Sequence, residues 1–109
     1  MATEILPRLF VPDFHNNANF MMWRNMLLRT TQKGYARVSA AIRDTDMQTS
    51  TSCLTLPTLA VVGDKDAATP PALVRGTAGL VVGSQFGIIF YARHLPSVEK
   101  PDVLIDLFA

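Results

Sequence analysis

The sequence predicts an α/β fold in which a helical first half precedes a strand-helix-strand-helix second half with parallel strands. Three observations predict it: apolar residues recur at helical spacing before residue 50, two short apolar runs follow residue 57, and a helical pattern separates those runs. Such a crossover joins parallel strands. The 109 residues, 49% of them hydrophobic, suffice for one small domain and not for two.

The first part of the chain predicts an irregular entry and then a helix. Prolines bracket the entry at residues 7–12. From residue 18 to about 31, apolar side chains recur three, four and seven positions apart, which is typical of a helix with a broad apolar face. Asn16 or Asn17 is a suitable residue to cap this helix.

A second, shorter amphipathic helix is predicted after an interruption at Gly34, and it ends near Arg43. The small polar stretch 49–52 is the most linker-like segment of the chain. We therefore divide the sequence into a helical segment, residues 1–50, and an α/β segment, residues 51–109.

The second half predicts two buried strands and two helices. The continuously apolar run 57–63 is typical of a parallel strand that is buried on both faces. Thr69 is a candidate helix cap, prolines follow it in the first turn, and Gly83 is expected to end that helix. Residues 86–90 predict the second strand, and residues 101–108 predict the last helix.

Charge and hydropathy exclude two classes of partner. Ten basic and nine acidic residues give a net charge of +1, with no basic stripe for nucleic acid. The longest apolar runs, such as 59–62 and 88–92, are far shorter than the roughly 20 residues that span a bilayer. No secretory signal is evident at the N-terminus, so we expect a cytoplasmic protein that binds neither nucleic acid nor membrane.

The single cysteine, Cys53, excludes an internal disulfide and fits a reducing compartment. A reactive thiol needs a neighbouring base or cation. Ser52 and Leu54 offer neither, which favours a chemically inert cysteine.

Two polar residues follow the predicted strands, where ligands and catalytic groups gather in open α/β sheets. Asp66 lies three residues after Gly63, and His94 lies four residues after Phe90. An imidazole held by a carboxylate keeps one tautomer and can act as general base and then general acid. The alternatives stay open at this point: Asp66 as a turn or helix-entry carboxylate, and His94 as a loop histidine with a backbone partner.

Five segments resemble a known family. PTLAVVGDKDAATPP (57–71) resembles the acid-bearing stretch of α/β-hydrolases, and RHLPSVEKP (93–101) resembles their histidine-bearing stretch. In the first half, LPRLFVPDF (6–14), GYA (34–36) and AAIRD (40–44) resemble the helical cap of 3-oxoadipate enol-lactonases. The resemblance covers nearly the whole chain, but only the C-terminal part of such an enzyme.

The resemblance implies a partial α/β-hydrolase fold, with a helical cap remnant at 1–50 and the C-terminal part of the core at 51–109. It implies that Asp66 is the acid and His94 the general base of a serine hydrolase, while Asp64 is the competing acid. The implied reaction is hydrolysis of a small anionic lactone or carboxylic ester in aromatic catabolism, in the β-ketoadipate pathway. No metal or organic cofactor is implied.

The nucleophile of that family is missing from these residues. Its serine occupies the centre of Gly-x-Ser-x-Gly, because a strained turn crowds the neighbouring positions. The glycine pairs of the right spacing, 79–83 and 83–87, have Val81 and Gln85 at their centres, and Ser84 is one position off. We therefore predict no hydrolysis by this chain alone.

Three further residues are candidates for substrate contact. Arg8 and Arg43 suit the carboxylates of an anionic substrate, and the alternative for both is a solvated surface charge. Trp23 is a candidate pocket residue whose alternative role is packing. Asp13 and His15 form a weak metal pair because no third ligand is near in sequence.

Three functional interpretations remain open. The chain is either an incomplete hydrolase that needs a complementing chain, or a non-catalytic, hydrolase-derived module that binds a small acid or protein, as a homodimer for example. An unrelated α/β binding module would make both motifs coincidental. A two-stranded parallel sheet with an apolar edge also invites dimerisation or aggregation.

Overall fold

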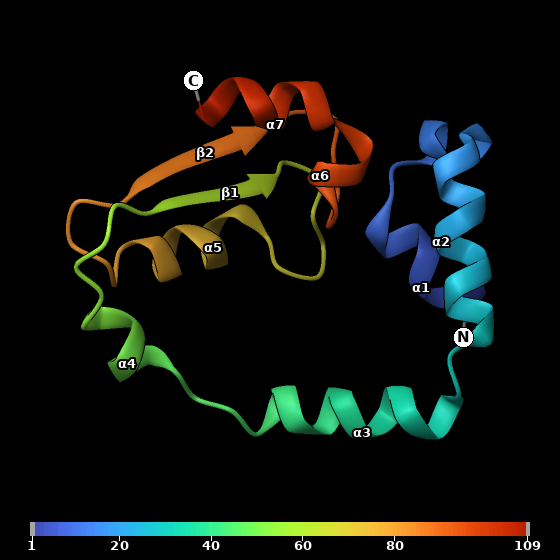
Figure 1. The fold of residues 1–109 in the computed structure, drawn as a ribbon, viewed down its shortest axis with the longest axis horizontal. Coiled ribbons are helices and arrows are strands. Elements are labelled where there is room, and N and C mark those ends of the chain that lie inside the picture. The colour runs from blue at the N-terminus through green and yellow to red at the C-terminus, as the bar shows by residue number, and fades with distance from the viewer. Residues whose placement is uncertain (1, 109) are drawn as a thin grey trace.

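The computed structural model describes residues 2–108, which form a small parallel sheet and several helices (Figure 1). The helices of the first half extend away from the sheet, and the second half alternates strands and helices. The elements, in chain order, are α1 (Ala2–Leu9), η1 (Pro12–Asn16), α2 (Ala18–Arg29), α3 (Gln32–Arg43), α4 (Gln48–Ser52), β1 (Leu59–Gly63), α5 (Pro71–Ala78), β2 (Gln85–Ile89), α6 (Pro96–Glu99) and α7 (Pro101–Phe108).

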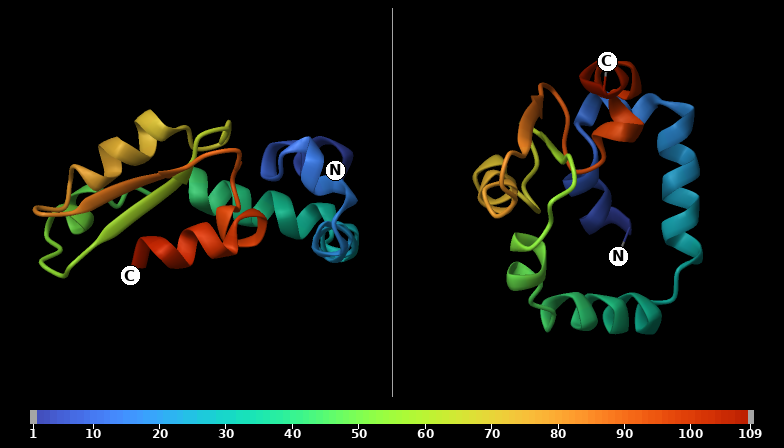
Figure 2. Two further views of the ribbon diagram at one scale, coloured as in Figure 1. Left: turned by 90° about the horizontal axis from the view of Figure 1, so that it is seen from above. Right: turned by 60° about the vertical axis from the view of Figure 1, so that its left-hand side comes forward.

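The sheet consists of β1 and β2, which pair in parallel with Leu59 opposite Gln85 and Gly63 opposite Ile89. Helix α5 provides the crossover between them, as the sequence predicts. Helices α5 and α7 lie on opposite faces of the sheet (Figure 2). Because the strands are parallel, both carboxyl ends meet at one edge, and the loops after β1 and β2 emerge together there.

A cluster of buried apolar side chains lies between the first helices and the loop that follows β2. Phe10 is fully buried at its centre and stacks on Phe14, with ring centroids 4.9 Å apart, while Phe20 meets Phe10 edge to face at 5.8 Å. Leu95 and Val98, from the segment around α6, pack against this cluster. The N-terminal helices are therefore joined to the end of the sheet by aromatic packing.

Polar side chains at the start of α2 and α3 satisfy free backbone N–H groups, as helix caps do. Asn17 accepts a hydrogen bond from the Asn19 N–H at 2.8 Å, which agrees with the expected cap. Thr31 accepts from the Gly34 N–H at 3.0 Å, so α3 begins at Gln32. The expected interruption at Gly34 is therefore wrong, because this glycine lies in the first turn of the helix.

Other boundaries also differ from the expected ones. The entry is helical, because Pro7 lies near the end of α1, where its missing N–H costs a single hydrogen bond. The polar stretch at residues 49–52 is part of α4, in which the Ser50 and Ser52 hydroxyls bond to backbone carbonyls. Helix α5 ends at Ala78, and Gly83 lies beyond it, in the turn before β2.

Large apolar side chains are exposed over much of the described chain. Helix α3 lies apart from the sheet, at the opposite side of the molecule (Figure 1). No helix within residues 2–108 combines the length and hydropathy needed to cross a bilayer. The exposed apolar residues with more than half of their surface accessible are Met22, Leu28, Val38, Ile42, Met47, Leu56, Leu73, Val82, Phe90, Tyr91, Ile105 and Phe108.

Candidate functional site

The loop after β1 buries the carboxylate of Asp66. Its Oδ1 accepts hydrogen bonds from the N–H groups of Ala68 and Thr69, both at 2.9 Å. The residue is 6% exposed. The loop thus wraps its own backbone donors around one oxygen and leaves the other oxygen, Oδ2, free to face a second loop.

That second loop presents His94, whose Nδ1 lies 2.9 Å from Asp66 Oδ2. An ionised carboxylate only accepts hydrogen bonds, so the proton of this bond belongs to Nδ1. The Thr69 hydroxyl donates to the same Oδ2 at 2.9 Å and lies 3.3 Å from the imidazole Nδ1. About a third of the His94 side chain, 34%, is solvent accessible, whereas 4% of the Asp66 side chain is. The arrangement is a partly exposed imidazole that is oriented by a buried carboxylate.

The ends of the two strands are fastened to each other by backbone hydrogen bonds. The N–H of Asp64 donates to the carbonyl of Ile89, and the N–H of Lys65 donates to that of Ala92, each at 2.9 Å. Gly63 makes this approach possible, because a Cβ there would overlap the backbone carbonyls of Ala92 and its successor. Strand β1 must therefore end in glycine for the two loops to meet.

The chain reaches His94 through a strained turn. Tyr91, two residues after β2, has φ of 58°, a left-handed conformation that costs a non-glycine residue roughly 1–2 kcal/mol. The next residue, Ala92, is fully buried. The backbone N–H of His94 donates to the carbonyl of Leu9 at 3.1 Å. The histidine loop is thus attached to the end of α1 as well as to the sheet.

The electrostatics of the pair favour an ionised Asp66. Burial by itself raises the pKa of this carboxyl, but hydrogen bonds from the Thr69 backbone and hydroxyl and from His94 outweigh burial. The net result is a pKa below the ordinary value. A carboxylate that stays charged near neutral pH accepts the Nδ1 proton of the imidazole that it faces and so fixes the tautomer and orientation of the ring.

The structure distinguishes Asp66 from Asp64 and shows that the two candidate arginines are exposed. Asp64 lies beside the Ala92 N–H, at 3.4 Å from its Oδ1, and Asp66 is the aspartate that bonds to the imidazole. Arg8 is exposed on α1, and Arg43 forms an exposed ion pair with Asp44 at 2.8 Å. In that pair the pKa of Arg43 is raised and that of its partner is lowered by their mutual hydrogen bond.

Trp23 is partly buried and packs against the aromatic cluster, with its ring centroid 6.4 Å from that of Phe10. His15 stacks on Phe20 at 4.4 Å. Among residues 2–108, no group of three histidine, cysteine, aspartate or glutamate side chains is placed to hold a metal ion. Asp13 and His15 therefore lack a third ligand within the described chain.

Ser84 is remote from the imidazole. It precedes β2, so the whole strand separates it from the carboxyl edge, a distance of about 16 Å for five residues. Its hydroxyl bonds to the carbonyl of Ala78. The hydroxyl therefore caps the turn before β2 and is not placed to react with a substrate held at His94.

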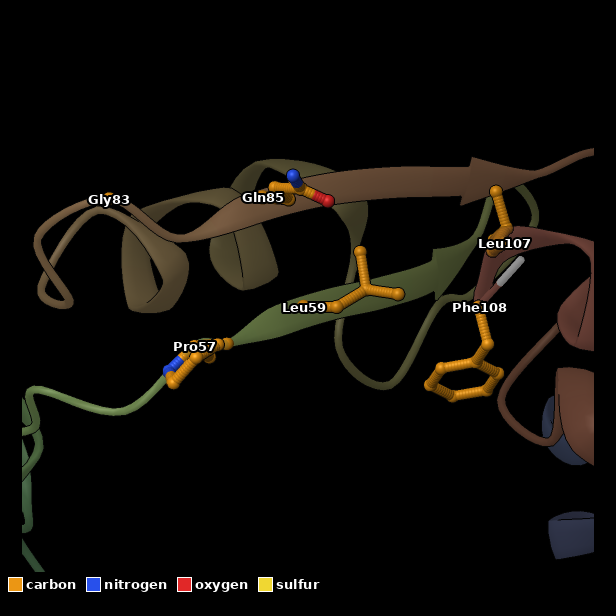
Figure 3. Close-up of a pocket in the computed structure, with 7 residues that line it drawn as sticks. Pro57, Leu59, Gly83, Gln85, Leu107 and Phe108 are labelled. Carbon is orange, nitrogen blue, oxygen red and sulfur yellow. The ribbon is translucent and has the colours of Figure 1, made fainter.

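A surface pocket of about 380 Å³ lies at the amino ends of the strands, opposite the edge that carries Asp66 and His94 (Figure 3). It is formed by the first residues of both strands and the end of α7, including Leu59, Gln85 and Phe108. Ligands of parallel sheets bind beyond the carboxyl ends of the strands, where Asp66 and His94 lie. We therefore do not assign this pocket to the site.

Two residues of the site were not found from the sequence. Thr69 was expected as a helix cap, but α5 begins after Pro70 and the Thr69 hydroxyl bonds to Asp66 instead. Glu99 is buried on α6 and bonds to the backbone beside His94. For Thr69, its spacing of three residues from an aspartate in a turn was the available signal. No local signal pointed to Glu99.

No protein-family model matches the chain, and no curated protein does. Solved structures do match, among them an enol-lactonase and an esterase. The enol-lactonase from Burkholderia xenovorans LB400 superimposes with a TM-score of 0.90 at 27% identity, and 98% of this chain covers 42% of that protein. A thermophilic esterase from Thermogutta terrifontis, with malate bound, superimposes with a TM-score of 0.83 at 30% identity, and 98% of this chain covers 40% of it.

The chain has an α/β-hydrolase-like fold. This confirms the predicted fold class at that level. The chain spans about two-fifths of the length of the structures it matches, which agrees with a partial fold.

Proposed function

We propose that this chain supplies the acid-base pair of a serine hydrolase that acts on carboxylic esters or lactones. The observation that carries the proposal is the 2.9 Å bond between the buried Asp66 carboxylate and Nδ1 of the partly exposed His94 imidazole. The pair lies at the carboxyl edge of a parallel sheet, and the solved structures that resemble the chain include an enol-lactonase and an esterase.

In the proposed reaction, Asp66 holds the Nδ1 proton, so the free electron pair of His94 lies on Nε2. The imidazole takes the proton of a serine hydroxyl as its oxygen attacks the carbonyl carbon, and the Asp66 carboxylate stabilises the resulting imidazolium. The proton then passes to the leaving alkoxide. The same imidazole then deprotonates a water that attacks the acyl carbonyl. As the ester bond to serine breaks, the imidazolium returns this proton to the serine oxygen, and the carboxylic acid is released.

The serine must come from polypeptide outside these 109 residues, because they contain no Gly-x-Ser-x-Gly. The outer edge of β1 and the exposed apolar side chains are suited to receive that polypeptide. An unpaired strand edge presents backbone donors and acceptors to another chain. We propose a hydrolase-fold segment as the complementing partner, paired along β1.

For the substrate, we propose a small anionic enol-lactone of the 3-oxoadipate type, in aromatic catabolism. The cap-like segments at residues 6–14 and 34–44 and the match to an enol-lactonase support it. Arg8 and Arg43 are the proposed partners of the substrate's carboxylates, and Trp23 a lining residue. Arg43 would exchange its exposed bond to Asp44 for the substrate.

The exposed apolar surface favours a second candidate function, a non-catalytic dimerising or binding module. Exposed apolar patches and open strand edges are both common sites of association. In that case two copies would cover the sheet edge of each other, and no serine would be required.

Complementation tests the two functions. We would mix the chain with the part of the Burkholderia enol-lactonase that it does not cover, and measure hydrolysis of an enol-lactone and of a p-nitrophenyl ester. We expect turnover by the mixture and none by either part. His94→Gln should lower turnover about 10²–10⁴-fold, while the control Asp64→Asn should not.

Equal turnover with His94→Gln would contradict the assigned base. A mixture that does not associate, together with a dimer of this chain in analytical ultracentrifugation, would favour the non-catalytic module.

A further inference from the structure

The carboxylate of Glu99 joins two segments that are far apart in the sequence. Its Oε1 accepts a hydrogen bond from the Arg93 N–H, and its Oε2 accepts one from the Val11 N–H, both at 2.8 Å. Glu99 is 8% exposed. A buried carboxylate is expected to be fully hydrogen bonded, and these two backbone donors satisfy it.

These bonds involve residues on both sides of His94 in the sequence. Arg93 directly precedes His94, and Glu99 ends the one-turn helix α6 that directly follows its loop. The N–H of His94 itself donates to the carbonyl of Leu9, two residues before Val11. The backbone at 93–94 is thus held at two successive N–H groups, both by way of the segment at residues 9–11.

We propose that Glu99 is a positioning residue for His94. It fixes the histidine loop against the segment after α1, so that the imidazole stays within hydrogen-bond reach of Asp66. This role rests on the proposed function, in which His94 is the general base. Glu99 then determines the position of that base, although it touches neither substrate nor the imidazole. Among the described residues, 2–108, the buried carboxylates are those of Asp66 and Glu99, and Glu99 takes no part in the proposed acid-base chemistry.

Glu99→Gln tests the proposal, because it keeps the size of the side chain but turns one acceptor into a donor that faces an N–H. The matched control is Glu4→Gln, the same change at an exposed position. The readouts are the NMR resonance of the His94 Nδ1 proton and the hydrogen exchange of the Val11 and Arg93 amides.

With Glu99→Gln we expect at least about tenfold faster amide exchange at these two positions, and a shifted or broadened Nδ1 proton resonance. The control should leave both unchanged. A merely structural role would alter amide exchange but not the Nδ1 proton, and that outcome would overturn the proposal. Unchanged exchange at Val11 and Arg93 would also overturn it.

If the Gln variant does not fold, Glu99→Asp provides the test, because it keeps the charge and withdraws the carboxylate by one methylene. A displaced Nδ1 resonance supports positioning, and an unchanged one refutes it. These measurements use the chain by itself and require no turnover. Failed complementation would therefore count against the proposed function and leave the role of Glu99 standing.

Discussion

Replacing Asp66 by Asn should destabilise the fold by about 2 kcal/mol at neutral pH. The Asn carbonyl can still accept from the Ala68 and Thr69 N–H groups that bond to Oδ1. The amide that replaces Oδ2, however, faces the His94 Nδ1 proton and the Thr69 hydroxyl. Charge-assisted hydrogen bonds contribute about 1.5–3 kcal/mol each. Part of this loss can be recovered, because the Thr69 hydroxyl can rotate and the His94 imidazole can move its proton from Nδ1 to Nε2.

The loss should depend on pH in a defined direction. Because the native pKa of Asp66 is lowered, its stabilisation is complete above about pH 5, and it disappears as the pH falls below about 3.9 towards the native pKa. Thermal unfolding followed by circular dichroism should show a Tm about 8–16 °C lower for Asp66→Asn at pH 7, with a smaller difference at pH 3.

Asp64→Asn is the control for this experiment, since Asp64 makes one long contact, at 3.4 Å. An equal loss in the control would refute the reasoning. So would a difference between Asp66→Asn and the parent chain that persists unchanged at acid pH.

Two further substitutions test the loops. Gly63→Ala should destabilise the chain by about 3 kcal/mol in urea unfolding, because the added Cβ would overlap the histidine loop. Gly76→Ala is the control and should not destabilise the chain, because a Cβ there has open space. Equal effects of the two substitutions would contradict the close approach at Gly63. Thr69→Val removes a donor to Asp66 and should raise the carboxyl pKa measured by ¹³C NMR. Thr77→Val should leave that pKa unchanged, and a shift in both would refute the assignment.

The parallel sheet and the meeting of Asp66 with His94 could be predicted because they follow from short-range patterns and one topological rule. The apolar runs identify strands, the helical pattern between them implies a parallel crossover, and parallel strands bring their carboxyl ends to one edge. Two polar residues placed after those ends must then lie near each other. Spacing alone does not decide whether Asp64 or Asp66 is the acid. The family resemblance decides this in favour of Asp66.

Contacts between distant segments could not be predicted. Glu99 bonds to Val11, 88 residues away, and no periodicity links the two positions. Thr69 has the spacing of a helix cap, yet its hydroxyl has a better acceptor in the buried Asp66 carboxylate than in a free helix N–H. In both cases the deciding factor is the three-dimensional position of a buried charge.

Helix boundaries were missed because the residues that usually break helices do not end the helices here. Pro7 lies close to the end of α1, and Gly34 lies in the first turn of α3, where Thr31 caps its N–H. Gly83 has φ of 76°, which suits the turn before β2, and it does not end α5. A proline or glycine therefore predicts that an irregularity is near, but it does not predict the residue at which a helix ends.

The geometry of the acid-base pair is determined by bonds within the chain. Asp66 is held by its own loop, the two loops are joined across Gly63, and Glu99 attaches the histidine loop to residues 9–11. None of these bonds involves the outer edge of β1. The orientation of His94 should therefore be the same before and after a partner binds, so that association would add a nucleophile to a base that is already in position.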